Sequence, residues 1–366
     1  MALVLEDGEL IRETFEIERF LGEGAFARVY RAYDRLLRRR VALKVFKRDF
    51  PDIDELAETL SEGRILNELE HRNIVRVFDA GIFERGGHKN GYFAMEYVAG
   101  GTLEAHWQSY GNRYMPVSEA VDLVRQVAEG LAGAHGRHPP IIHRDIKPQN
   151  ILVGWDGQGL RARLGDFGLA KSVSPVTLLA SAHGTIGFKP PEAFMGEDTT
   201  GSDVWALGAT LYRLLTDRFP YPEMVHQGFG SGHNFVAELA SPRAYNVLVD
   251  ADLEDIVLKC LAIDRQDRFV DANVLRSRLA AWSPPEPEKA SGSQDSTFAA
   301  SKLTATRDVK AQARLEQQIR DAFRLAKTSG HLDTAADLLE SAIAKSPDLR
   351  ARHGSRLVQW RRGVWL

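Results

Sequence analysis

The chain has 366 residues, a net charge of −3 and a pI of about 6.4, so it lacks the general basic field that favours nucleic acid. Its single cysteine, Cys260, excludes a disulfide framework and a cysteine zinc site. A signal peptide begins with basic side chains, but residues 1–10 carry none. No run of about 18 apolar residues occurs either, so we expect a cytoplasmic protein without a membrane segment.

The first part of the chain predicts a small sheet with a phosphate-binding turn. Strands are expected over residues 15–21, 29–30 and 41–45. Between the first two, Gly22 and Gly24 would bring backbone N–H groups close to phosphates because no Cβ intervenes. Lys44 lies inside the apolar third strand. A lysine there is costly unless its ammonium meets an anion.

A helix is expected over residues 53–69, where apolar side chains recur at helical spacing. Glu62 lies in its middle and Glu58 one turn earlier, and from spacing alone either is as well explained as a surface carboxylate. Two strands are expected next, over residues 74–78 and 92–96. A long amphipathic helix follows over residues 118–135, with Ser118 as its candidate N-cap.

The segment from His143 to Asn150 carries the chemistry. Asp145, Lys147 and Asn150 place a carboxylate, an ammonium and a carboxamide close together, and Asp166 follows just before Phe167-Gly168. Phosphoryl transfer needs one carboxylate to orient an attacking hydroxyl and accept its proton, and a cation to offset charge on the phosphoryl group. It also needs an amide oxygen and a second carboxylate to hold Mg²⁺. The pattern therefore predicts phosphoryl transfer.

The following segments predict a helical region. Residues 169–190 are rich in Ser and Thr and lead to Pro191-Glu192. Asp203 begins an apolar helix and should have a structural partner there. Final helices are expected over residues 252–263 and 270–282, and Cys260 in the first of them is best explained as a small buried hydrophobe.

Together these motifs resemble the eukaryotic-type (Hanks-type) serine/threonine protein kinases, over about residues 11–282. The resemblance implies an α+β, bilobal fold, with a β-rich small lobe at residues 11–96 after an N-terminal segment at 1–10, and a helical large lobe at 97–282. It implies ATP and Mg²⁺, with Mn²⁺ as an alternative metal, between the lobes. The implied reaction transfers the γ-phosphoryl group to a Ser or Thr hydroxyl of a protein substrate.

The resemblance also implies roles for the matching residues. Asp145 is implied to be the base, and Lys147 the cation that stabilises the phosphoryl group. Lys44 is implied to orient the nucleotide, with Glu62 as its carboxylate partner. The implied metal ligands are Asn150 and Asp166. The implied nucleotide pocket consists of Leu21, Gly22, Gly24, Val29, Ala42, Lys44, Met95, Glu96, Val98 and Leu152. Met95 is equally explained as core filler. The pair Glu192 and Arg268 is implied to be architectural, and so is Asp203, as a brace for the catalytic loop.

Regulation and departures from the family pattern concern a few positions. The resemblance implies that a loop phosphate pairs with Arg144, and the regulatory candidates in the loop are Thr177, Ser181 and Thr185. For any one of these three, an ordinary polar loop residue is the alternative. The family's third loop glycine is Ala27 here, and its usual Tyr and Ala are replaced by Phe188 and Pro190.

Beyond the kinase-like region, residues 283–302 are rich in Pro, Ser, Gly and charge and predict a flexible linker. Residues 303–366 predict a helical tail, with the spacing of one tetratricopeptide-like helix pair or, equally well, of a generic helical hairpin. Residues 301–366 carry a net charge of +6 and residues 1–300 one of −9. The tail could dock on the acidic body or bind an acidic partner, or its charge could be a solvated surface.

Three functional hypotheses follow. The favoured one is an active kinase that phosphorylates its own activation loop, because every catalytic polar group is present. The alternative is a kinase-fold scaffold, or pseudokinase, that acts through a protein partner of its tail. In a mixed case, the tail of an active kinase recruits substrate or holds the kinase inactive. No hypothesis expects a nucleic-acid or membrane partner.

Overall fold

The computed structural model describes residues 4–24, 26–50, 69–111, 114–167, 186–221, 239–284, 305–328 and 331–364, without the side chains of 49 and 305–311. Several predicted site residues lie outside this set: Glu62, Thr177, Ser181 and Thr185. The proposals that concern them stay predictions.

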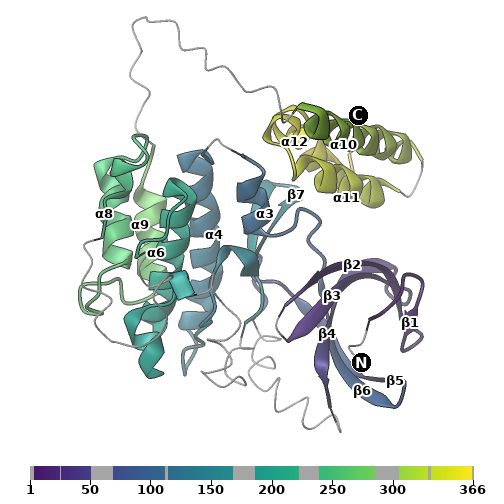
Figure 1. The fold of residues 1–366 in the computed structure, drawn as a ribbon, viewed down its shortest axis with the longest axis horizontal. Helices are drawn as coiled ribbons and strands as arrows, with labels where there is room; N and C mark the ends of the chain where they lie inside the picture. The colour runs from purple at the N-terminus through teal and green to yellow at the C-terminus, as the bar shows by residue number, and fades with distance from the viewer. Residues whose placement is uncertain are drawn as a thin grey trace, which may run out of the picture.

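The small lobe is an antiparallel sheet (Figure 1). Its strands are β1 (Leu10–Ile11), β2 (Phe15–Glu23), β3 (Ala27–Asp34), β4 (Arg39–Asp49), β5 (Val77–Arg85) and β6 (His88–Glu96). They are ordered β1-β2-β3-β4-β6-β5. Side chains alternate between the two faces of a strand, so Leu43 and Val45 of β4 join the lobe's core while Lys44 faces the other side.

One strand prediction was wrong in position. The strand expected over residues 74–78 begins at Val77 and continues to Arg85 as β5. The reason is the pair Gly86 and Gly87, whose φ angles of 58° and 80° form a two-residue hairpin turn that sets β5 against β6. Ile74 forms an isolated bridge with Leu164 of the large lobe instead.

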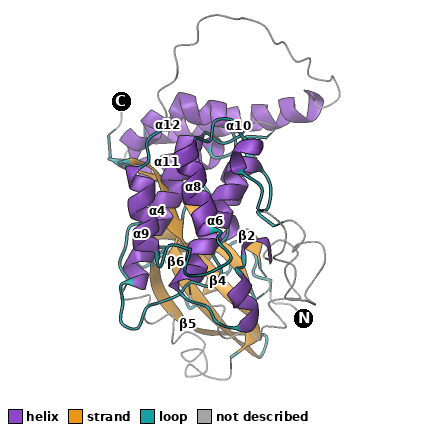
Figure 2. Cartoon of the chain, turned by 90° about the vertical axis from the view of Figure 1, so that its left-hand side faces the viewer, coloured by secondary structure: helices purple, strands orange, loops and turns teal. Residues whose placement is uncertain are grey.

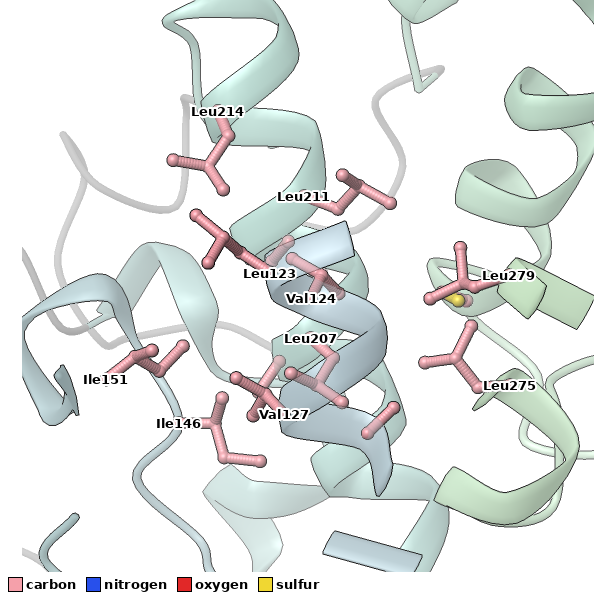
Figure 3. Close-up of a cluster of buried hydrophobic side chains, with 14 of the residues drawn as sticks. Leu123, Val124, Val127, Ile146, Ile151, Leu207, Leu211, Leu214, Leu275 and Leu279 are labelled. Atoms are coloured by element: carbon pink, nitrogen blue, oxygen red, sulfur yellow. The ribbon is translucent and has the colours of Figure 1, made fainter. Parts of the chain in front are cut away.

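The large lobe is mainly helical. Its elements are α3 (Leu103–Gln108), α4 (Val117–His135), β7 (Ile151–Asp156), β8 (Gly159–Leu164), α6 (Thr200–Thr216), α8 (Ala251–Cys260) and α9 (Ala272–Ala281), with 3₁₀ turns over residues 148–150, 186–188, 191–195 and 242–244. Figure 3 shows its core, where Val127 of α4 lies against Leu207 of α6 and Leu275 belongs to α9. Among the described helices, none combines the length and the apolarity needed to cross a bilayer.

The start of α4 differs from the prediction. The helix begins at Val117, and Pro116 rather than Ser118 occupies its N-cap position. Proline tolerates this position because its missing N–H would have had no partner there, and its carbonyl accepts a hydrogen bond from Ala120 N–H at 3.0 Å. Ser118 therefore lies inside the first turn.

The tail consists of α10 (Ala305–Ala326), α11 (Leu332–Ile343) and α12 (Pro347–Arg361). Figure 2 shows these helices together at one end of the molecule. They share an apolar core that includes Ala335, Leu339 and Trp360. A helical extension is thus present, while its likeness to a tetratricopeptide pair stays a prediction.

Candidate active site

The predicted catalytic residues of the loop lie in contact around one carboxylate. Lys147 Nζ lies 2.8 Å from Asp145 Oδ2. Asn150 Nδ2 donates to the same oxygen at 2.8 Å and to the carbonyl of Asp145 at 2.7 Å. Lys147 and Pro148 lead into a 3₁₀ turn that ends at Asn150, so local backbone geometry turns the amide back to Asp145. The carboxylate, cation and amide that spacing predicted are therefore adjacent.

Asp203 at the start of α6 fixes the backbone of this loop. Its Oδ2 accepts a hydrogen bond from His143 N–H at 2.7 Å, and its Oδ1 accepts one from Arg144 N–H at 2.9 Å. His135 Nε2 contacts Oδ2 at 3.0 Å. Arg144 has a φ of 69°, a left-handed conformation that costs free energy for a non-glycine residue. The predicted brace is confirmed, and it offsets this strain.

His143 joins the loop to the segment that carries Asp166. Its Nε2 contacts the carbonyl of Gly165 at 2.8 Å, and its Nδ1 accepts from Asp145 N–H at 3.2 Å. These partners assign the proton to Nε2 in a neutral ring. Burial lowers the pKa of His143, in agreement with this state. The ring also packs edge-on against Phe167, with centroids 4.5 Å apart.

Asp166 lies where the two lobes meet. Its Oδ1 is 2.5 Å from Nζ of Lys44 on β4. Burial acts to raise the pKa of Asp166, but the Lys44 ammonium outweighs it and holds that pKa below its usual value. Gly165 N–H donates to the carbonyl of Asn150 at 2.8 Å, so the two predicted metal ligands belong to hydrogen-bonded backbone segments. Asp166 has a φ of 60°, a second strained residue at the site.

The predicted nucleotide residues of the small lobe align across neighbouring strands. Gly22 pairs with Val29, and Val29 pairs with Lys44. Ala42 pairs with Met95 on the other side of β4. Leu21 and Gly24 lie at the same end of β2, Glu96 ends β6, and Val98 follows it; Leu152 lies on β7. The sheet register therefore gathers residues that are widely separated in the sequence.

The structure explains two positions in this lobe: Ala27, which replaces the third loop glycine of the family, and Met95, which could also be a core residue. The methyl group of Ala27 is buried with Phe46 and Phe93, so this residue fills a small aromatic cluster. Met95 packs against the same cluster, which supports its explanation as core filler. Its predicted place in the nucleotide pocket remains a prediction.

Three charged side chains that contact predicted site residues were not themselves predicted: Asp198, Lys189 and Arg163. Arg144 Nε lies 3.7 Å from Asp198 Oδ2, and Lys189 Nζ donates to the carbonyl of Arg144. Burial raises the pKa of Asp198. Glu96 pairs with Arg163 of β8 at 2.9 Å. No signal in the sequence distinguishes Asp198, Lys189 or Arg163 from ordinary surface charges, because only the folded chain brings them to the site.

The predicted pair of Glu192 and Arg268 is confirmed, with Arg268 Nη1 2.7 Å from Glu192 Oε1. Ser202 Oγ donates to the same oxygen at 2.8 Å. Burial acts to raise the pKa of Glu192, but these hydrogen bonds outweigh it and lower that pKa. The pair ties the end of the segment before α6 to the segment before α9.

A family model described as the protein kinase domain matches residues 15–279. The chain belongs to the protein kinase family. It is 33% identical over 287 residues to the serine/threonine-protein kinase pkn2 of Myxococcus xanthus, a match covering 76% of this chain and 34% of that protein. It is 34% identical over 280 residues to the serine/threonine-protein kinase PrkC of Bacillus subtilis, covering 74% and 41%. The chain thus spans between a third and a half of the length of these curated relatives.

Solved structures agree on the fold. The crystal structure of the Mycobacterium tuberculosis PknI kinase domain has a TM-score of 0.57 at 24% identity, and the match covers 76% of this chain and 99% of that one. A second structure of the same kinase domain gives a TM-score of 0.56 at 25% identity. Residues 15–279 therefore form a bilobal protein kinase domain.

Proposed function

We propose that the chain transfers the γ-phosphoryl group of ATP to Ser or Thr hydroxyls of a protein substrate, its own activation loop included. One arrangement carries the proposal: Asp145, Lys147 and Asn150 lie in contact, and the backbone of Asn150 and Gly165 joins them to the Lys44–Asp166 pair. A base, two cations and two oxygen ligands converge where the lobes meet. Phosphoryl transfer depends mainly on such positioning and charge.

In the proposed reaction, Asp145 orients the substrate hydroxyl and accepts its proton. The hydroxyl oxygen forms the new bond to the γ-phosphorus, and the bond from that phosphorus to the bridging oxygen of ADP breaks. Lys147, 2.8 Å from Asp145, offsets charge on the phosphoryl group as it moves. Lys44 contacts the α- and β-phosphates, which replace Asp166 as its anionic partner. Glu62 is proposed to orient Lys44.

The residues present fit a divalent metal. Asn150 donates through Nδ2, which leaves its amide oxygen as a potential ligand. The lowered pKa of Asp166 keeps this carboxylate ionised at neutral pH. Amide and carboxylate oxygens suit Mg²⁺, and Mn²⁺ accepts the same ligands. When bound, the metal would neutralise charge on the nucleotide phosphates.

The proposed regulation places a phosphate on Thr177, Ser181 or Thr185, paired with Arg144. The carboxylate of Asp198 near the Arg144 guanidinium supports it, since an anion already lies beside that guanidinium. A phosphate carries more charge and more acceptor oxygens than a carboxylate, so it would be the stronger partner.

The test is autophosphorylation with labelled ATP and Mg²⁺, with phosphosites mapped by mass spectrometry. Wild type is compared with Asp145→Asn and Lys44→Met. We expect label in wild type only, between Ser172 and Thr185, and its loss when EDTA removes the metal. Label elsewhere keeps the kinase but rejects the loop switch. ATP binding without label in any sample rejects the proposed activity and favours the scaffold alternative.

A further inference from the structure

The tail is fixed to the large lobe at two places. Strand β7 lies beside α11 and α12 (Figure 1). Trp155 of β7 packs against the tail's apolar core, and its backbone N–H donates to Glu340 Oε1 of α11 at 2.8 Å. Arg350 of α12, 6% exposed, donates to Tyr110 OH at 2.8 Å and to Ser109 Oγ at 3.0 Å, both just after α3. Buried charged contacts of this kind require a specific orientation of the tail.

Two glycines allow this close approach. A Cβ added at Gly354, inside α12, would lie 2.8 Å from Cη2 of Trp155. A Cβ added at Gly154 of β7 would lie 2.8 Å from Glu340 Oε1. Glycine weakens a helix interior, so Gly354 is a position where surface packing has outweighed helix propensity. The sequence therefore provides a glycine on each side of this contact, one on β7 and one on α12.

The tail also reaches the small lobe. Arg40 of β4 donates through Nη1 to Thr334 Oγ1 at 3.3 Å and to Asp337 Oδ2 at 3.4 Å, both on α11. Arg361 lies 2.7 Å from Asp337 and 2.5 Å from Glu340. Asp337 is thus shared between a small-lobe arginine and the charge cluster that holds the tail on the large lobe.

The tail lies next to the segment that connects the two lobes. A polar pocket of about 250 Å³ is bordered by residues 96–99 of that connection and by Asp337, Glu340 and Arg361 of the tail. Arg40 lies four residues before Lys44 on β4, and β7 starts directly after Asn150. The tail therefore contacts the two strands that carry or adjoin predicted site residues, one in each lobe.

We propose that α11 braces the two lobes, with Asp337 as a positioning residue that holds β4, and thereby Lys44, in its orientation over Asp166. Glu340 and Arg350 anchor the tail on the large lobe, and the Asp337–Arg40 pair restrains the small lobe. The proposal rests on the roles proposed above for Lys44 and Asp166. It makes the tail a support of ATP binding, the opposite of an inhibitory tail.

The first experiment measures lobe orientation directly and needs no activity. Leu36 and Val247, 79% and 90% exposed, lie in different lobes and are replaced by cysteine for spin labels; Cys260 is buried and stays unlabelled. Double electron–electron resonance then gives the distribution of distances between the two labels in the full chain. Asp337→Asn should broaden or shift it. Asp333→Asn, which removes the same charge from an exposed position of α11, should leave it unchanged. Equal distributions for the two variants overturn the brace.

The second experiment separates nucleotide binding from chemistry. Asp337→Asn should raise KM for ATP by about two- to fivefold, as expected for a partly exposed ion pair, with kcat nearly unchanged. The double variant with Arg40→Gln should show less than the sum of the two single effects, because both changes remove the Arg40–Asp337 contact. Arg40→Gln also removes the Arg40–Glu18 pair, and Asp337→Asn also removes the Asp337–Arg361 pair. Additive effects, or a lowered kcat with unchanged KM, reject the proposal. An inactive wild type would reject the proposed function, and the distance measurement would still decide on the brace.

Discussion

At the scale of single residues, the site separates groups that carry chemistry from groups that hold them. Asp145 faces Lys147 and Asn150, whereas the carboxylate of Asp203 accepts hydrogen bonds from the backbone N–H groups of residues 143 and 144. Asp203 is 1% exposed, so a change there leaves buried N–H groups without an acceptor. The position of Asp145, the proposed base, therefore depends on a residue that holds the backbone next to it.

Asp203→Asn is expected to affect both stability and rate. Its amide keeps one acceptor but presents an NH₂ group to a backbone donor, so the free energy of unfolding should fall by about 2–4 kcal/mol. Misplacement of Asp145 should lower kcat by about 10²-fold, with a smaller effect on KM for ATP. Urea titration and steady-state kinetics measure these changes. A stable variant with wild-type kcat would show that the loop is held by other contacts.

His143 predicts a pH dependence of stability. Its folded pKa lies below the ordinary 6.5, so the unfolded chain binds the proton first as pH falls. This contribution to stability is complete above pH 6.5 and is lost below it, by about 1.4 kcal/mol per pH unit at most. Unfolding free energies of wild type and His143→Gln at pH 7.5 and 5.5 test this. Parallel changes in the two proteins would contradict it.

At the scale of elements, strands and helices set which residues meet. β4 carries Lys44 to Asp166 because its neighbours β3 and β6 hold it in the middle of the sheet. In the large lobe, α6 packs against α8 through Gly208, where an added Cβ would overlap that of Cys260. On α4, Gly133 is exposed and has open space around its Cβ position.

These two helical glycines should respond in opposite directions to alanine. Gly208→Ala should destabilise the chain by about 1–3 kcal/mol, because overpacking between helices exceeds the gain in helix propensity. Gly133→Ala should stabilise it by about 0.5–1 kcal/mol through propensity alone. Thermal and chemical unfolding give both values. A stabilising Gly208→Ala would mean that α8 moves away freely.

At the scale of the whole molecule, the tail and the large lobe share one packed boundary. Trp360, 1% exposed, lies in the tail core that also receives Trp155 from β7. The tail's basic character is partly used here, since Arg350 and Arg361 have partners on the kinase or within the docked tail. Of the alternatives for its charge, docking on the body therefore has structural support.

Trp360→Ala should loosen the tail while the kinase core persists. Loss of this side chain should cost about 3–5 kcal/mol of tail stability. Hydrogen exchange should then accelerate in α10–α12 and at Trp155, but not around Leu123 of α4. Val364→Ala, at a residue 42% exposed, is the control and should change little. Accelerated exchange throughout the large lobe would show that tail and lobe unfold as one unit.

Much of the site was predictable because its residues are close in sequence. Asp145, Lys147 and Asn150 fall within residues 145–150, and the Phe167-Gly168 pair that follows it identifies Asp166. Apolar pattern alone predicts a strand at residues 74–78, whereas the Gly86-Gly87 turn, also a local signal, places β5 at Val77–Arg85. The cap of α4 was missed because Pro116 serves through its backbone rather than its side chain.

The sequence by itself determined the family, the adjacency of Asp145, Lys147 and Asn150, and the helical nature of the tail, since each rests on local spacing and periodicity. Only the tertiary structure decided that Lys44 pairs with Asp166, that Asp198 lies beside Arg144, and that Asp337 reaches Arg40. These contacts join residues far apart in the chain, and their charges look the same in sequence whether solvated or paired. Long-range packing brings them together, and no local pattern records it.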